Sequence, residues 1–139
     1  MGKRQNQSFL VNYIKLDKAC SDMLEIKSGG VSEYINKIGA SSIPERKELM
    51  SRLVKYRGIR NKLAHEVGAL DKMSEINGED IKWVKSFEKS VLSGRDPYSL
   101  YQKKLRKSTK GYKAKRALVI FLVLVVIAAA AAVAFMLLK

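Results

Sequence analysis

Apolar residues recur along residues 1–94 at spacings of three and four, which is the period of an α-helix. The first apolar stripe covers about 8 to 28 and stops at Gly29 and Gly30, since glycine adopts the left-handed cap conformation at little cost. A shorter stripe follows from 32 to about 37. No stretch shows the alternation of a half-buried strand. We therefore predict an all-α protein.

Turn and capping residues divide the next part of the chain into further helices. Ser42 and Glu45 have the spacing of a capping box, which predicts a long third helix running to about 66 or 67. Gly68 and Gly78 bound a segment from about 69 to 76, and a last helix begins at 79 or 80 and ends at Gly94. Short loops between amphipathic helices indicate antiparallel neighbours, so residues 1–94 are predicted to form one small helical bundle.

The chain ends in an uncharged, uniformly apolar run at residues 117–138. A helix over this run would span roughly 33 Å, which is enough for a bilayer core. A helix buried in a protein core is the alternative, but the run is too long and too uniformly apolar for it. We predict a single transmembrane helix followed only by Lys139, which would make the protein tail-anchored.

The formal net charge of +14 is unevenly distributed. Residues 95–116 hold nine basic residues and one acid, Asp96, directly before the predicted span. The positive-inside rule then predicts a cytoplasmic bundle on a prokaryotic inner membrane, and Lys103–Arg116 would bind anionic lipids. An RNA-binding arm is the alternative for this segment. The expected organisation is a bundle at 1–94, a polybasic juxtamembrane segment at 95–116 and a transmembrane helix at 117–138.

Cys20 is the only cysteine and His65 the only histidine. One cysteine allows no internal disulfide, which is typical of a reducing cytosol. The two residues cannot form a zinc site by themselves, and the chain contains no glycine-rich phosphate-binding loop. We therefore expect no cofactor and no metal.

The candidate chemistry lies late in the third predicted helix, in the sequence Arg60-Asn61-Lys62-Leu63-Ala64-His65. An arginine fork fits phosphate, and histidine changes charge near neutral pH. Asn61 and His65 are four residues apart and can touch on a helix, whereas Arg60 is predicted to lie in the middle of an apolar stripe. These three residues are candidates for metal-free cleavage of a phosphodiester. The alternative is that His65 caps the helix or packs against it.

This six-residue sequence resembles the signature of the HEPN superfamily, in which an arginine and a following polar residue precede a histidine. Its position late on a long helix is similar too, and the resemblance covers about 8 to 94. It implies a dimerising helical bundle in which Arg60 and His65 cleave RNA without metal, with Asn61 as the polar residue. Members of this superfamily that are toxins paired with a nucleotidyltransferase antitoxin often carry a tyrosine two residues after the histidine, which the antitoxin modifies. This chain has Val67 there, so the resemblance does not extend to that regulation.

Together with the predicted span, the resemblance implies a homodimeric, membrane-held endoribonuclease that acts as a toxin or phage-defence effector. His65 would act as general base on a ribose 2′-hydroxyl, Arg60 would stabilise the phosphorane, and Asn61 would hold His65 or a phosphate. A non-catalytic, membrane-tethered dimerising adaptor is the alternative. Gly58 shares the face of Asn61 and His65, so its missing side chain would let a second subunit approach. A tolerated glycine on a solvent face explains it equally well.

Overall fold

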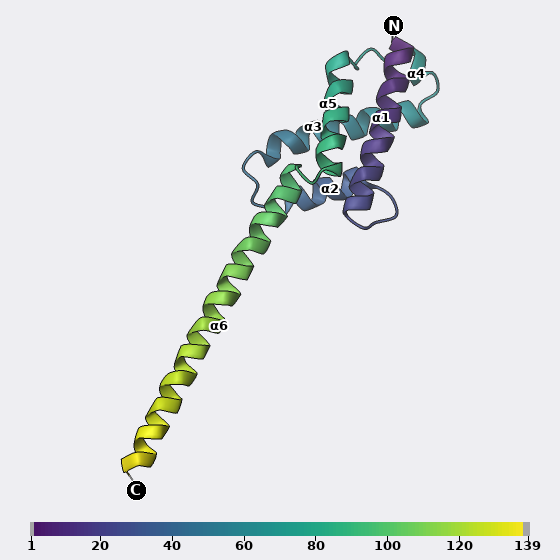
Figure 1. Ribbon diagram of the computed structural model, residues 1–139. Coiled ribbons are helices and arrows are strands. Elements are labelled where there is room, and N and C mark those ends of the chain that lie inside the picture. The colour runs from purple at the N-terminus through teal and green to yellow at the C-terminus, as the bar shows by residue number, and fades with distance from the viewer. Residues whose placement is uncertain (1, 138–139) are drawn as a thin grey trace. The chain divides into compact units, whose positions relative to one another are not determined.

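The computed structural model describes residues 2–137, with side chains described except at 110, 111, 113–115, 126 and 128–137. Over this range the elements follow in the order α1 (Gly2–Met23), α2 (Gly30–Gly39), α3 (Arg46–His65), α4 (Ala69–Lys72), α5 (Gly78–Leu92) and α6 (Pro97–Leu137) (Figure 1). The described chain contains no strand, so the prediction of an all-α protein is confirmed.

The chain divides into two compact units, Met1–Tyr101 and Gln102–Lys139. The first unit holds α1 to α5 together with the first turn of α6, and the second holds the rest of α6. Within the first unit, α1 is central: it packs most extensively against α5, and also against α2, α3 and α4. Helix α3 packs chiefly on α2.

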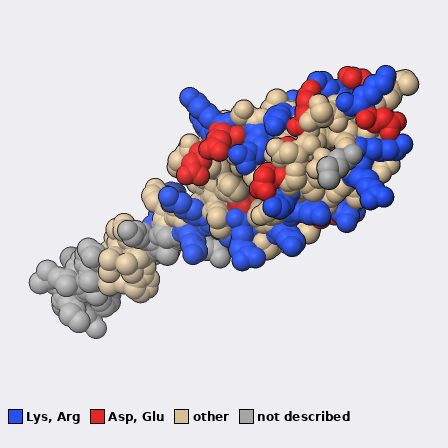
Figure 2. Space-filling model, turned by 90° about the horizontal axis from the view of Figure 1, so that it is seen from above, with Lys and Arg blue, Asp and Glu red and all other residues tan. Residues whose placement is uncertain are grey.

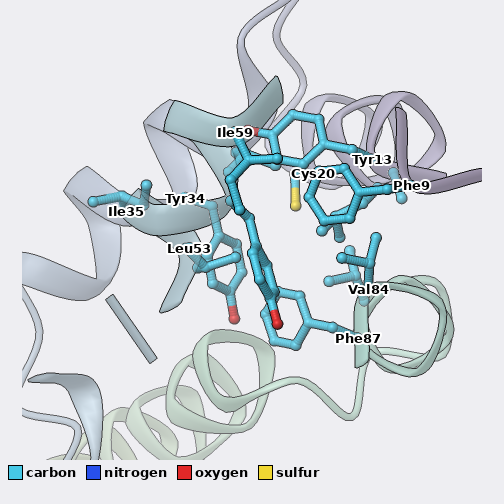
Figure 3. Packing of buried hydrophobic residues seen from close by; sticks show 14 of the residues in the cluster. Phe9, Tyr13, Cys20, Tyr34, Ile35, Leu53, Ile59, Val84 and Phe87 are labelled. Carbon is cyan, nitrogen blue, oxygen red and sulfur yellow. The ribbon is translucent and has the colours of Figure 1, made fainter. Parts of the chain in front are cut away.

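The core of the first unit is formed by apolar side chains from α1, α2, α3 and α5 (Figure 3). Its fully buried members are Phe9, Leu16, Cys20, Val31, Tyr34, Ile38, Leu53 and Val84. Burying a large apolar side chain stabilises a fold by about 1.5–3 kcal/mol, so these contacts hold the helices together.

Helix α1 begins several residues earlier than the apolar pattern predicted. Its first turns are polar, but Asn6 is buried and donates hydrogen bonds to the carbonyls of Leu70 and Met73, both at 2.9 Å. These bonds tie the start of α1 to α4 and the segment behind it. The predicted helix over 69–76 ends at Lys72, because Met73 adopts an extended conformation.

Helix α2 begins close against α1 at Gly30. A Cβ atom on Gly30 would lie 2.2 Å from the carbonyl oxygen of Asp17 and 2.3 Å from the backbone nitrogen of Ser21. The Asp17 carboxylate also accepts a hydrogen bond from the Val31 amide at 2.9 Å. Gly30 is therefore required for packing rather than for ending the first helix, which stops at Met23.

The predicted capping box at Ser42 and Glu45 is wrong. Glu45 is the N-cap of α3 and makes no side-chain capping bond. The capping box lies instead at the start of α5, where the Asp80 amide donates to Asn77 Oδ1 at 2.9 Å and the Asn77 amide donates to Asp80 Oδ2 at 3.0 Å. Burial alone would raise the pKa of Asp80, but the Asn77 amide, the Tyr56 hydroxyl and Lys55 hold it below its usual value.

Helix α6 begins at Pro97, within the segment that the sequence analysis treated only as polybasic. Asp96 is completely buried and caps this helix: its Oδ1 accepts from the amides of Tyr98 and Ser99, both at 3.1 Å. The same oxygen accepts from the Tyr34 hydroxyl at 2.7 Å. Proline fits the first helical position because its missing amide hydrogen has no helical acceptor there.

The predicted transmembrane helix at 117–138 requires correction. Among the described residues, no helix is both long and apolar enough to cross a membrane. A span needs about 20 consecutive apolar residues, and side chains in this run are described only at 117–125 and 127. The rest of the predicted span lies outside the described side chains. The tail anchor inferred from sequence is therefore not supported.

Candidate functional site

The predicted site residues lie near the end of α3, but Arg60 is placed differently from expectation. The buried residues of α3 are Leu53, Tyr56, Ile59 and Leu63. Arg60 is only half-buried at the edge of this face, not in its middle. The predicted apolar stripe was centred on Arg60 and did not include Ile59, which lies about 100° round the helix from Arg60. Including Ile59 turns the buried face away from Arg60.

The opposite side of α3 is an open face, which we define as Val54, Gly58, Asn61 and His65. All four residues are exposed to solvent, so their predicted common face is confirmed. Arg60 Nη1 donates to Asn61 Oδ1 at 3.1 Å on this side of the helix. Among the described residues, the His65 side chain makes no hydrogen bond or ion pair, and so none with Asn61. The fold thus brings Arg60 and Asn61 together and leaves His65 one turn further along.

Gly58 makes the open face flat. A Cβ added at Gly58 would meet nothing within 4 Å. Val54 beside it keeps 44% of its surface exposed. Nothing in the described chain covers this part of α3, so a ligand or another subunit has room to approach the helix backbone.

Two arginines line the edge of α3 that lies near α1. Arg57 Nη1 donates to Ser32 Oγ at 3.3 Å, which leaves most of its N–H donors unused. Burial raises the pKa of the Tyr13 hydroxyl above its usual range, while Arg60 and Arg57 act in the opposite direction. The guanidinium groups are therefore close enough to stabilise negative charge at this edge.

The bundle unit is basic overall. Residues 1–101 carry 18 Lys and Arg against 13 Asp and Glu. Lys and Arg cover much of the face seen in Figure 2, whereas Asp and Glu are confined to a few groups. Lys62 pairs with Glu75 at 3.7 Å, and both side chains are about half exposed. A pair of this kind contributes at most about 1 kcal/mol, so Lys62 can exchange Glu75 for a phosphate.

A second candidate site, missed by the sequence analysis, is the groove between α3 and α5. One end is a cavity of about 350 Å³ lined by Leu49, Trp83 and Phe87, among others. Trp83, which lines this cavity, is only half-buried. The sequence signal for the groove is weak, because it consists of one large aromatic residue beside lysines on α5.

The described residues contain no group of three or more His, Cys, Asp or Glu that could hold a metal ion. The candidate groups for chemistry late in α3 are the Arg60 guanidinium, the Asn61 amide and the His65 imidazole. Together they can bind an anion, and the imidazole can accept a proton from a hydroxyl group placed beside it.

Comparison with known proteins overturns the proposed resemblance to the HEPN superfamily. No curated protein and no solved structure matches the chain. Residues 7–118 match a family described as "Family of unknown function (DUF6548)", and no HEPN family matches. The HEPN resemblance rested on six residues within one helix, whereas the family match extends over most of the chain. The chain therefore belongs to the DUF6548 family of unknown function.

Proposed function

We propose that the open face of α3 binds RNA and that Arg60, Asn61 and His65 cleave it without a metal ion. The observation that carries this proposal is the Arg60–Asn61 hydrogen bond, which holds a guanidinium beside the face that His65 shares. No acidic residue occurs in α3 between Glu48 and Glu66, so nothing on this stretch of the helix repels phosphate.

Binding would begin with the phosphate groups. Asn61 engages one Arg60 nitrogen, and the remaining N–H groups are left to pair with phosphate oxygens. Lys62 would add a second contact after exchanging Glu75 for phosphate. Because Gly58 has no side chain, the sugar–phosphate backbone can lie close to the helix at that point. Binding of this kind weakens steeply as salt is raised.

Cleavage would use the ribose 2′-hydroxyl as nucleophile. His65 takes the hydroxyl proton as the oxygen attacks phosphorus, and Arg60 stabilises the charge on the phosphorane. The bond to the 5′-oxygen breaks, and this oxygen takes up a proton. The products are a 2′,3′-cyclic phosphate and a 5′-hydroxyl. A second copy across the open face would supply another His65 as the acid.

The test compares binding and cleavage of one labelled RNA in EDTA by wild type, His65→Ala, Arg60→Ala and the control Lys27→Ala, an exposed loop lysine. His65→Ala should lose about 10²–10⁴-fold in cleavage but still bind. Arg60→Ala should lose both, and Lys27→Ala should lose neither. If wild type does not bind RNA at low salt, the proposal fails. If wild type and His65→Ala both bind RNA and neither cleaves it, the function is RNA binding without cleavage.

The second candidate function is a dimerising adaptor without catalysis. It is favoured by the bare surface at Gly58 beside the half-exposed Val54, which suits close packing of another copy. Sedimentation combined with the RNA cleavage assay distinguishes the two candidates. An adaptor would be dimeric in wild type, would become monomeric in Gly58→Leu, and would leave RNA intact throughout.

A further inference from the structure

The groove between α3 and α5 has an apolar end and a polar end. The apolar cavity of about 350 Å³ is lined by Ile43, Leu49, Trp83 and Phe87, among others. It continues into a wider polar part of about 790 Å³. Glu48, Arg52 and Trp83 line both parts, so the two form one continuous surface with Trp83 in its middle.

Trp83 presents a large aromatic surface that is held rigidly. Its ring stacks on Phe87 with centroids 4.9 Å apart and 11° between the planes, and it meets Tyr56 edge-on at 5.3 Å. The Arg52 guanidinium carbon lies 5.3 Å from the Trp83 ring centroid. Rigid, partly uncovered aromatic residues beside an arginine are typical of the energetically dominant contacts in protein interfaces.

The groove has a surplus of acid in an otherwise strongly basic chain. Each of its three basic residues is paired with an acid: Arg52 with Glu48 at 3.7 Å, Lys55 with Asp80 at 3.6 Å and Lys82 with Glu79 at 2.8 Å. Glu45, which lines the apolar end, is exposed and has no ion pair among the described residues. The surface is therefore suited to a segment that combines bulky apolar residues with positive charge.

Such a segment is present in the chain itself, in the first part of α6. Leu105 and Tyr112 are seven residues apart and therefore share one helix face, and they are 43% and 69% exposed. Tyr101 continues this face one turn earlier. Exposed basic side chains surround the stripe, at Lys104, Arg106 and Lys107. This is an amphipathic basic helix whose apolar stripe is left exposed.

We propose that the α3–α5 groove of one copy binds residues 101–112 of α6 from a second copy. The apolar stripe would cover Trp83, and the flanking lysines and arginines would meet the acids of the groove. Reciprocal binding by two copies closes into a two-fold dimer. This proposal does not depend on RNA binding by α3.

Trp83 is the only tryptophan, so its fluorescence reports on the groove directly. The experiment uses the full chain in a non-ionic detergent, because the side chains from Leu118 to Val125 are apolar and exposed. Wild type should show a blue shift of Trp83 emission as the protein concentration rises. Emission that does not change with concentration would overturn the proposal, including the case in which Trp83 is already shielded at the highest dilution.

Two complementary variants make the test specific. A groove variant carries Glu45→Lys and Glu48→Lys, and a tail variant carries Leu105→Glu and Tyr112→Glu; all four side chains are exposed, and circular dichroism checks that helix content is unchanged. Each variant alone should self-associate about tenfold or more weakly than wild type. The control Asp22→Lys, an exposed acid outside the groove, should behave as wild type.

Mixing the two variants should restore association and the Trp83 shift, since the groove variant supplies an intact tail and the tail variant an intact groove. Only the tail variant keeps an unaltered groove, and each such groove needs an intact tail from the groove variant, so the shift should be largest near equal amounts of the two variants. If the mixture behaves as the sum of its two components, α6 does not bind in the groove and the proposal is wrong.

Discussion

The bundle contains two regions that each have a glycine and a hydrogen bond between polar side chains, buried in one region and exposed to solvent in the other. The first is the closed seam, which we define as Gly30, Tyr34, Cys20 and Asp96. The second is the open face of α3 defined above. The residues of the seam are all buried, and the hydrogen bond from Tyr34 to Asp96 measures 2.7 Å. On α3 the corresponding polar contact, from Arg60 to Asn61, is exposed and measures 3.1 Å.

Because of this difference in burial, the contacts of the closed seam stabilise the fold, whereas those of the open face are available to bind a ligand. A buried polar group that loses its partner costs about 1–3 kcal/mol, so the bonds of the closed seam stay formed. An exposed bond exchanges readily with water, and therefore also with a ligand. The same contrast holds for glycine, because Gly30 lies against another helix and Gly58 has nothing near it. The following predictions test this contrast, from the largest expected effect to the smallest.

Cys20 should be almost unreactive in the native protein. Burial, reinforced by Asp17 and Asp96, raises the pKa of its thiol to about 12. Since the thiolate is the reactive form, alkylation at pH 8 should be about 10³-fold slower than in the unfolded chain. The rate should remain well below that of unfolded protein at pH 10, because this pH is still below the raised pKa. Iodoacetamide labelling followed by mass spectrometry measures this. Equal rates with and without denaturant would show that the seam is open.

Asp96→Ala should lower the free energy of unfolding by about 3 kcal/mol. The change removes the cap of α6, worth about 1 kcal/mol, and leaves the Tyr34 hydroxyl buried without an acceptor, at about 1–3 kcal/mol. Urea denaturation monitored by circular dichroism measures the loss. Asp96→Asn is the matched control: it keeps an oxygen for Tyr34 and for the cap, so it should lose clearly less. A loss for Asn as large as that for Ala would argue that charge, not capping, matters here.

Gly30→Ala should destabilise the fold by about 1–3 kcal/mol. Its new methyl group would meet backbone atoms of Asp17 and Ser21, which can move only if α1 and α2 separate. Thermal melting of the variant beside wild type provides the measurement. An unchanged melting temperature would mean that α2 does not pack this closely on α1.

Gly58→Ala should have the smallest effect, and in the opposite direction. Alanine favours a helix over glycine by about 1 kcal/mol, and a methyl group at this position meets nothing in the chain. The same denaturation experiment should therefore show a slightly more stable protein. Destabilisation would indicate that the open face is already covered by another copy in solution. If Gly58→Ala is more stable than wild type but binds RNA less well, RNA lies close to the helix at Gly58.

Much of the local structure could be predicted from the sequence alone. The helical period along residues 1–94 predicted the all-α class. Because angular position on a helix depends only on spacing, the same period placed Gly58, Asn61 and His65 on one face. Turn residues such as Gly78 also located the break before α5 to within two residues. These are local properties, set by residues within a few positions of one another.

Other features depend on contacts between residues far apart in the chain, and only the tertiary structure decided them. Asp96 could be recognised as a turn residue from its neighbour Pro97, but its bond to Tyr34 joins positions 62 residues apart. The exposure of Trp83 depends on how α3 and α5 lie around it. The sequence pattern predicted Arg60 at the centre of the apolar face of α3. Arg60 lies at the edge of that face, because Ile59 is buried in the core and the buried face is centred away from Arg60. A short motif within one helix carries none of this information, which is why Arg60-Asn61-Lys62-Leu63-Ala64-His65 misidentified the family.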